Sequence, residues 1–98
     1  MKHEVIQLMV HSLDAIELYL KSIEEIRKNN WNNANQLINN GDLRLRKAQK
    51  VRETIVENEN FEILEESVNY TFAIQSVTNA EKFKNNVLNL FKASENII

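Results

Sequence analysis

Residues 5–26, VIQLMVHSLDAIELYLKSIEEI, decide the fold because their apolar residues recur with the spacing of a helix. Alternating steps of three and four join one apolar stripe, Ile6, Met9, Leu13, Ile16, Leu20 and Ile23. A second stripe lies beside it and contains Val5, Leu8, Ala15, Tyr19 and Ile26. This spacing predicts one amphipathic helix. Because two neighbouring stripes must bury against more than one partner, we expect packing within the chain together with contact between subunits.

A second helix is predicted after a very short turn. The polar residues Lys28, Asn29 and Asn30 end the first pattern, and Asn30 can cap the next helix by accepting a hydrogen bond from its free amides. The stripe that follows is Trp31, Ala34, Ile38, Gly41, Leu45, Ala48, Val51 and Ile55. Glycine inside a helix costs about 1 kcal/mol relative to alanine, so we expect Gly41 to let a neighbouring helix approach closely.

A third helix is predicted after a polar loop at residues 57–60, ENEN. Its apolar positions are Leu64, Val68 and Phe72, followed by Tyr70, Ala73, Val77, Ala80, Phe83, Val87, Leu90 and Phe91. We favour one continuous helix. The alternative is a break at residues 76–79, since Thr78 and Glu81 have the spacing of a capping box. Residues 1–98 are expected to form one domain.

Composition excludes several classes of protein. Among 98 residues, 12 are basic and 14 acidic, so a net charge of −2 gives no basic field to attract nucleic acid. The chain has no cysteine, which excludes a disulfide framework, a thiolate zinc site and a cysteine nucleophile. No apolar stretch reaches the roughly 18 residues of a membrane helix. Zero prolines and one glycine leave little for hairpin turns. We expect an all-α protein in the cytoplasm.

Candidate chemistry is sparse. His3 and His11 lie about two turns apart, so they could bind a metal ion only with ligands from elsewhere, and we interpret them as ordinary helix histidines. A surface pair between His11 and Asp14 is an alternative interpretation. Glutamates before Ser67 could act as paired carboxylates, namely Glu62, Glu65 and Glu66. Acidic residues are, however, typical of the first turns of a helix, which is the interpretation we favour.

A basic strip runs along the second helix and consists of Arg44, Lys47 and Lys50, with Arg46 and Arg52 alongside. Such a strip could grip an acidic or phosphorylated partner. We favour the alternative that it is a solvated face paired with glutamates of a neighbouring helix.

Three short motifs share one ungapped register over residues 2–56. They are HSLDA at residues 11–15, NWNNA at 30–34 followed by Leu37 and Ile38, and KAQK at 47–50. In this register they match HSGDA, GDFEKA followed by LI, and EAHxxQ, and residues 80–91 match more loosely. On these motifs the chain resembles the lactose/cellobiose-specific enzyme IIA family of the bacterial phosphoenolpyruvate-dependent sugar phosphotransferase system.

The resemblance implies an up-down-up, antiparallel three-helix bundle, similar to a spectrin repeat, that assembles as a homotrimer. It also implies that a histidine on the third helix takes phosphate from the phosphocarrier protein and passes it to the IIB component. In this chain that position falls on Asn69, and no histidine follows His11. The family's metal-associated aspartate falls on Phe72, and no aspartate follows Asp42. We therefore expect no catalytic residue, no metal site and no cofactor.

Three functions stay open. The first is an enzyme IIA-type component whose phosphoryl relay is impaired or lost, with Ser67, Tyr70, Thr71 or a glutamate as conceivable substitute acceptors. The second is a non-catalytic helical module that keeps the trimeric scaffold and binds or regulates another protein. The third is an unrelated helical hairpin protein, such as a secretion chaperone, which predicts a monomer with an exposed apolar groove. Even membership of the enzyme IIA family would leave the transported sugar undetermined.

Overall fold

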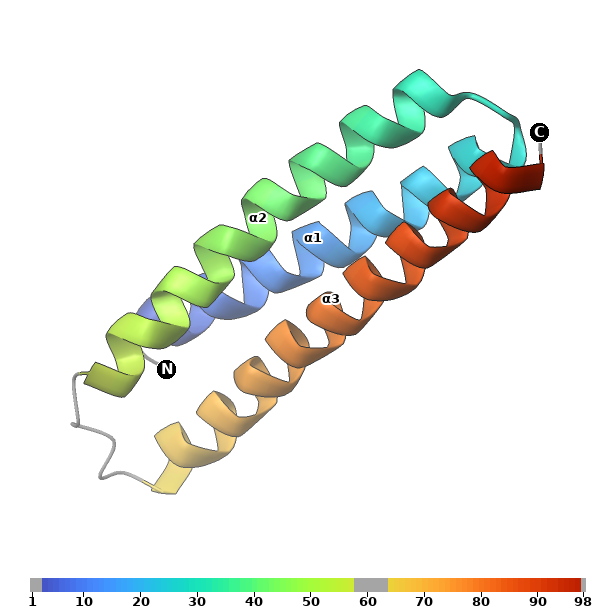
Figure 1. Ribbon diagram of the computed structural model, residues 1–98. Coiled ribbons are helices and arrows are strands. Elements are labelled where there is room, and N and C mark those ends of the chain that lie inside the picture. Colours follow the sequence, from blue (N-terminus) through green and yellow to red (C-terminus); the bar gives the residue numbers. More distant parts are fainter. Residues whose placement is uncertain (1–2, 58–63, 98) are drawn as a thin grey trace.

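The protein is built from three helices that lie side by side. The structure, a computed structural model, describes residues 3–57 and 64–97. They form α1 (His3–Arg27), α2 (Trp31–Glu57) and α3 (Leu64–Ile97), and these described residues contain no strand (Figure 1). The prediction of an all-α helical bundle is confirmed. Its principal extents are 53 × 18 × 16 Å, so the bundle is a rod with much surface for a small core.

The chain reverses between α1 and α2 within three residues. Asn29 has a φ of 63°, in the left-handed region that asparagine tolerates. This conformation terminates α1, whose last residue is Arg27. The amide of Asn30 donates to the carbonyl oxygen of Glu25 at 2.9 Å, and the carbonyl oxygen of Asn30 accepts from Ala34 at 2.9 Å. Asn30 therefore precedes the helix as predicted. Its side chain is used differently, because Nδ2 donates to Glu25 Oε2 at 2.7 Å.

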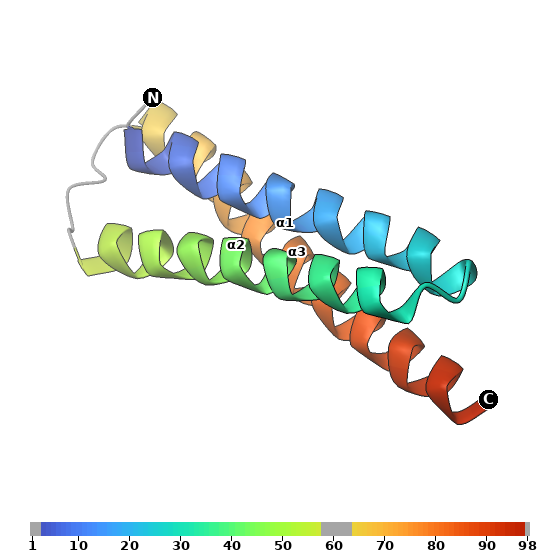
Figure 2. The ribbon, with the colours of Figure 1, turned by 90° about the horizontal axis from the view of Figure 1, so that it is seen from above.

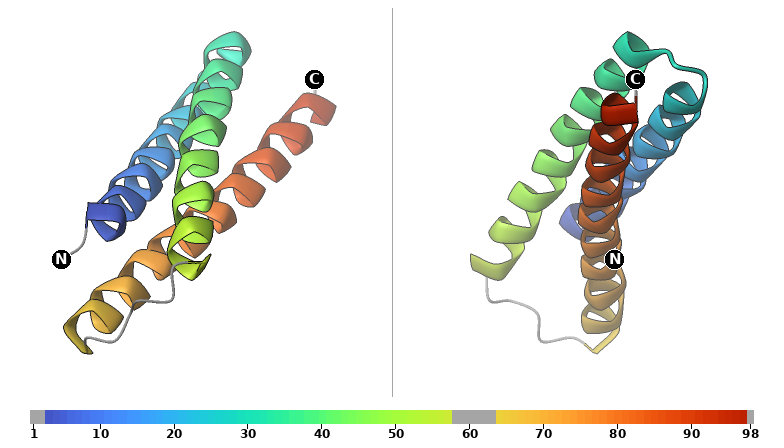
Figure 3. Two further views of the ribbon diagram at one scale, coloured as in Figure 1. Left: turned by 90° about the vertical axis from the view of Figure 1, so that its left-hand side faces the viewer. Right: turned by 45° about the vertical axis from the view of Figure 1, so that its right-hand side comes forward.

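The helices α1 and α3 begin at the same end of the rod, and α2 runs in the opposite direction (Figures 1 and 3). Figure 2 shows α3 crossing the pair formed by α1 and α2 at an angle. At the other end of the rod, the Trp31 ring at the start of α2 packs edge-on against the Phe91 ring of α3, with centroids 5.6 Å apart. This aromatic contact ties the late turns of α3 to the turn between the other two helices.

The core seam of α1 is the stripe that contains Tyr19. Its buried members are Val5, Leu8, Ser12, Ala15, Tyr19, Ser22 and Ile26. The apolar pattern of the sequence does not predict that the two serines are buried, because serine is polar. Each satisfies its hydroxyl within its own helix: Ser12 Oγ donates to the Leu8 carbonyl at 2.7 Å and Ser22 Oγ to the Tyr19 carbonyl at 2.6 Å. Their small size lets neighbouring helices approach closely at these positions.

The predicted stripe of α2 forms its core face. Ala34, Ile38, Leu45, Ala48 and Ile55 are buried with at most 4% of their surface exposed. At Gly41 a neighbouring helix approaches closely, as the sequence predicts. A Cβ atom at Gly41 would lie 2.7 Å from Cε1 of Tyr19. Non-bonded carbon atoms do not lie this close, so the ring or a helix would have to shift.

The helix α3 is continuous through residues 76–79, so the alternative of a break there is wrong. Its buried residues include Ala73, Val77, Ala80 and Val87, as the sequence predicts. Val68 and Phe72 were placed on the same apolar stripe, but they are 65% and 62% exposed. The reason is geometric: Phe72 lies about 100° around the helix from Ala73, which takes the core position at that level. Of the predicted loop residues 57–60, Glu57 is instead the last residue of α2, and residues 58–60 lie outside the described residues.

Candidate functional site

The positions that the resemblance assigns to catalysis lie on the early turns of α3. Asn69 is half-buried and Phe72 is exposed. The amide of Asn69 offers no nucleophile for phosphorus. Among the residues whose side chains the structure describes, no group of three or more histidine, aspartate and glutamate side chains could hold a metal ion. His3 and His11 therefore do not belong to such a group. The glutamates at 62, 65 and 66 and Ser67 lie outside the residues whose side chains the structure describes.

A polar link crosses the core and joins all three helices. Tyr19, fully buried on α1, donates its hydroxyl to Asp42 Oδ1 of α2 at 2.6 Å. Lys84 Nζ of α3 lies 3.8 Å from the same oxygen. Burial and the hydrogen bond to Asp42 both raise the pKa of Tyr19 well above its ordinary value. A phenol with a raised pKa stays protonated near pH 7, so Tyr19 serves as the hydrogen-bond donor of this link.

The basic strip of α2 divides into paired and unpaired cations. Arg52 Nη2 lies 3.2 Å from Glu81 Oε2 of α3, to which Gln49 also donates at 2.9 Å. Hydrogen bonds from Arg52 lower the pKa of Glu81, burial opposes them, and the bond from Gln49 adds to the lowering. The predicted pairing with a neighbouring glutamate is thus confirmed for Arg52. In the described part of the chain, Arg44 and Lys47 have no carboxylate within ion-pair distance.

His11 faces these two cations across the groove between α1 and α2. Its Nδ1 is sealed from solvent and has no hydrogen-bond partner. Burial, then the positive charges of Arg44 and Lys47, lower the pKa of His11, and Asp14 on its own helix opposes them. In the described part of the chain, no hydrogen bond or ion pair joins His11 to Asp14, and the effect of Asp14 is to oppose the lowering of that pKa. The side chain stays neutral near pH 7.

The lowered pKa of His11 predicts a pH dependence of stability. The groups around the ring are Arg44 and Lys47 from α2 and Asp14 from α1. Because the unfolded chain binds the proton more tightly, the free energy of unfolding should fall as pH drops from 6.5 toward the folded-state pKa. Urea unfolding at several pH values should show that His11→Gln flattens this slope, while His3→Gln leaves it unchanged. An unchanged slope in His11→Gln would contradict the assignment.

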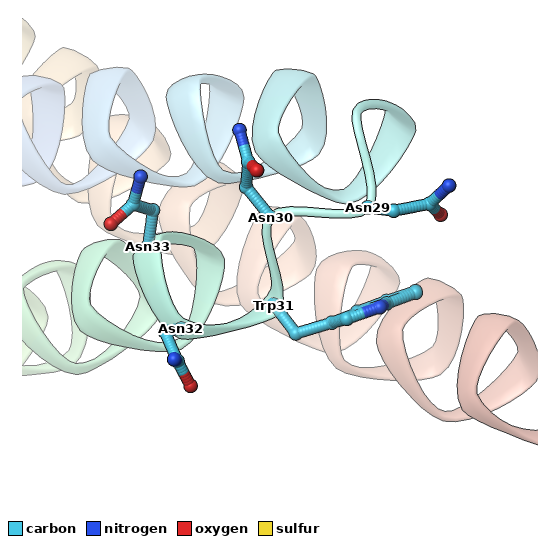
Figure 4. Close-up of a pocket in the computed structure, with 5 residues that line it drawn as sticks. All are labelled: Asn29, Asn30, Trp31, Asn32 and Asn33. Atoms are coloured by element: carbon cyan, nitrogen blue, oxygen red, sulfur yellow. The ribbon is translucent and has the colours of Figure 1, made fainter.

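A hollow of about 390 Å³ lies at the turn between α1 and α2, lined by Asn29, Asn30, Trp31, Asn32 and Asn33. Figure 4 shows that these side chains diverge. Asn30 and Asn33 point toward α1, Trp31 extends toward α3, and Asn29 and Asn32 point away from both. A binding site for a small polar ligand needs polar groups that converge on one point. This hollow is therefore a poor candidate for a binding site.

Large apolar side chains are exposed on two of the helices, and the surface they form is here named the α1–α3 face. It comprises Ile6, Leu13 and Leu20 on α1 and Val68, Phe72 and Leu90 on α3, each between 39% and 65% exposed. Met9, Ile16 and Ile23 fill the space between the α1 members and the core. Large hydrophobic residues exposed singly are ordinary, but a set at regular helical spacing marks an interaction surface.

Contacts with α2 show that both halves of this surface lie on the same side of the bundle. On α1, His11 and Leu18 border α2, and Ile6, Leu13 and Leu20 lie across the core seam from them. On α3, Glu81 and Lys84 contact α2, and Phe72 and Leu90 lie across the core seam of that helix. Both sets therefore flank the contact between α1 and α3, on the side away from α2.

Comparison with known proteins adds no assignment. No protein-family model matches the chain, and neither a curated protein nor a solved structure matches it. Among the described residues, no helix is long and apolar enough to span a membrane.

Proposed function

We propose that this protein is a non-catalytic helical interaction module of the cytoplasm, and that the α1–α3 face is its binding surface. The partner we assign to this face is further copies of the chain, assembled as a homotrimer. The observation that carries the proposal is the uncovered seam of Ile6, Leu13 and Leu20, which are 44%, 54% and 48% exposed. Residues of this size at heptad spacing are the positions that coiled coils bury between helices.

A second copy suits the face because each copy supplies the same apolar seam. From Ile6 to Ile23 no charged residue interrupts the positions that alternate by three and four. At the rim, Lys21 Nζ lies 3.3 Å from Glu17 Oε1 of the same helix. These two opposite charges are thus already paired within one helix. Association therefore does not place unpaired charges of the same sign from different copies side by side.

Phe72 gives the trimer a specific expectation. If three copies meet around α3, this exposed ring supplies an apolar plug at the position that the resemblance assigns to a metal-associated aspartate. An apolar axis needs no cation to offset buried like charges. The mass of the assembly should therefore be unchanged by EDTA. Sedimentation measures this mass. Dissociation of the assembly on adding EDTA would contradict the assignment of Phe72 to the axis of the trimer.

Charges placed in the α1–α3 face should dissociate the assembly. We expect Leu13→Glu combined with Leu20→Glu to weaken association by about 100-fold or more, since burying unpaired carboxylates costs several kcal/mol. Both side chains are about half exposed, so the single chain should still fold. Sedimentation measures the mass and circular dichroism the helicity.

The matched control is Leu43→Glu, because Leu43 is 51% exposed on α2, outside the α1–α3 face. It should leave the mass of the assembly unchanged. Equal dissociation by the control and the double variant would contradict the assignment of the face. So would an oligomer that the double variant leaves intact.

A second candidate function is the phosphoryl relay of an enzyme IIA-type component, with the phosphocarrier protein and the IIB component as partners. The ungapped resemblance over residues 2–56 favours it, and asparagine at position 69 counts against it. Incubation with phosphoenolpyruvate, enzyme I and the phosphocarrier protein tests it by intact mass. A stoichiometric, acid-labile phosphoryl adduct would establish the relay. A stable assembly without an adduct would favour the non-catalytic module.

A further inference from the structure

We propose that the groove between α1 and α2 binds a phosphate-sized oxyanion, with Arg44 and Lys47 as its cationic ligands and His11 beside them. This site lies on a different face from the α1–α3 face and does not depend on self-association. The residues come from both helices of the hairpin. The chemistry proposed is recognition of an anionic group, and no bond is made or broken.

The first argument is the uncompensated charge of Arg44 and Lys47. In the described part of the chain, two cations have a carboxylate of another helix within ion-pair distance: Arg52 has Glu81 and Lys84 has Asp42. Arg44 and Lys47 have none, although they stand one turn apart on the same side of α2. Their charge acts on His11, where it exceeds the opposing effect of Asp14.

The second argument is the orphan nitrogen of His11. Nδ1 is buried and has no hydrogen-bond partner within the protein, which is unusual for a buried polar atom. With Nδ1 sealed from solvent, Nε2 is the ring nitrogen left for an external ligand. An anion near the two cations would offset their field and favour the protonated ring, which would then be a third cationic ligand.

The third argument is the shape and lining of the groove. Beside these cations lies a hollow of about 330 Å³, lined by Leu18, Asn40, Leu43, Arg44 and Lys47. Asn40, Arg44 and Lys47 recur at steps of four and three, so an amide, a guanidinium and an ammonium share one stripe of α2. Each of the three groups offers N–H donors whose hydrogen bonds an oxyanion can accept. The two leucines reduce solvent around it, which strengthens charge-assisted hydrogen bonds.

The test uses inorganic phosphate on the full chain, followed through the ring protons of both histidines by NMR, with sodium chloride at matched ionic strength as reference. We expect a saturable change at His11, together with a rise of its pKa. His3 serves as the internal control, because it is exposed near the start of the same helix and should not respond.

Variants identify the ligands. Arg44→Gln should weaken phosphate binding by about tenfold or more, as expected for loss of a charge-assisted hydrogen bond. Arg27→Gln is the matched control, since Arg27 is exposed at the far end of α1 and should leave binding unchanged. Equal responses of His3 and His11, the same change with chloride, or equal weakening by both variants would overturn the proposal.

A second arm distinguishes the source of the phosphate group. A short phosphoserine peptide, compared with its unphosphorylated form, is titrated into the same sample. Tighter binding than inorganic phosphate assigns the site to phosphate carried on a polypeptide, and equal or weaker binding assigns it to the free ion. Saturable binding to neither probe would overturn the proposal.

Discussion

Truncation of Tyr19 to alanine is expected to lower the free energy of unfolding by about 3–5 kcal/mol. Tyr19 is fully buried on α1 and is the largest of the fully buried side chains. The substitution removes its ring from the core and its hydrogen bond to Asp42, which is 2.6 Å long. Small domains have a total stability of roughly 5–15 kcal/mol, so the variant should lose a large share of it and unfold at a lower urea concentration. Urea unfolding followed by circular dichroism measures the loss.

Tyr19→Phe separates the hydroxyl from the ring. It should cost about 1.5–3 kcal/mol, the usual contribution of a hydrogen bond to a charged group. Asp42 would keep Lys84, 3.8 Å from Oδ1, as its remaining partner. An alanine variant no less stable than the phenylalanine variant would contradict the central place of the ring in the core.

Replacement of Gly41 by alanine is the second substitution with a large expected effect. Alanine is the better helix former by about 1 kcal/mol, yet we expect a net loss of roughly 1–3 kcal/mol from overpacking. The new Cβ would lie 2.7 Å from Cε1 and 3.0 Å from Cδ1 of the buried Tyr19 ring. The ring cannot move freely, because it is fully buried and its hydroxyl is held by Asp42.

Two comparisons make this prediction specific. Asn39→Ala, at an exposed position of the same helix, gains propensity without a clash and should be neutral or slightly stabilising. In the background of Tyr19→Ala, the change at Gly41 should become stabilising, since the ring is gone. A double-mutant cycle with no coupling between the two positions would contradict the proposed contact.

Helix positions and most of the core could be predicted from the sequence because periodicity alone determines which residues share a face. The stripe of Ala34, Ile38, Leu45 and Ala48 is an example, since each is buried as expected. Local chemistry also placed the turn, where Asn29 takes the left-handed conformation. These features depend on neighbouring residues in the chain.

Features that depend on distant residues could not be predicted. Tyr19 and Asp42 are 23 residues apart, and no local pattern indicates that a phenol will meet that carboxylate. Periodicity also could not decide which apolar stripe faces inward. Val68 and Phe72 fit a helical stripe but lie outside the core, because Ala73 takes the inner position. The division of the basic strip into paired and unpaired cations likewise required the position of α3.

Sedimentation equilibrium of the unmodified chain, over a wide range of protein concentration, tests the central claim most directly. With the stoichiometry that the resemblance implies, the proposal predicts an assembly with three times the chain mass of 11.5 kDa. Its mass should be unchanged by EDTA, and the assembly should be lost in the variant that combines Leu13→Glu with Leu20→Glu. A single species at 11.5 kDa throughout would contradict the claim that this face binds further copies of the chain.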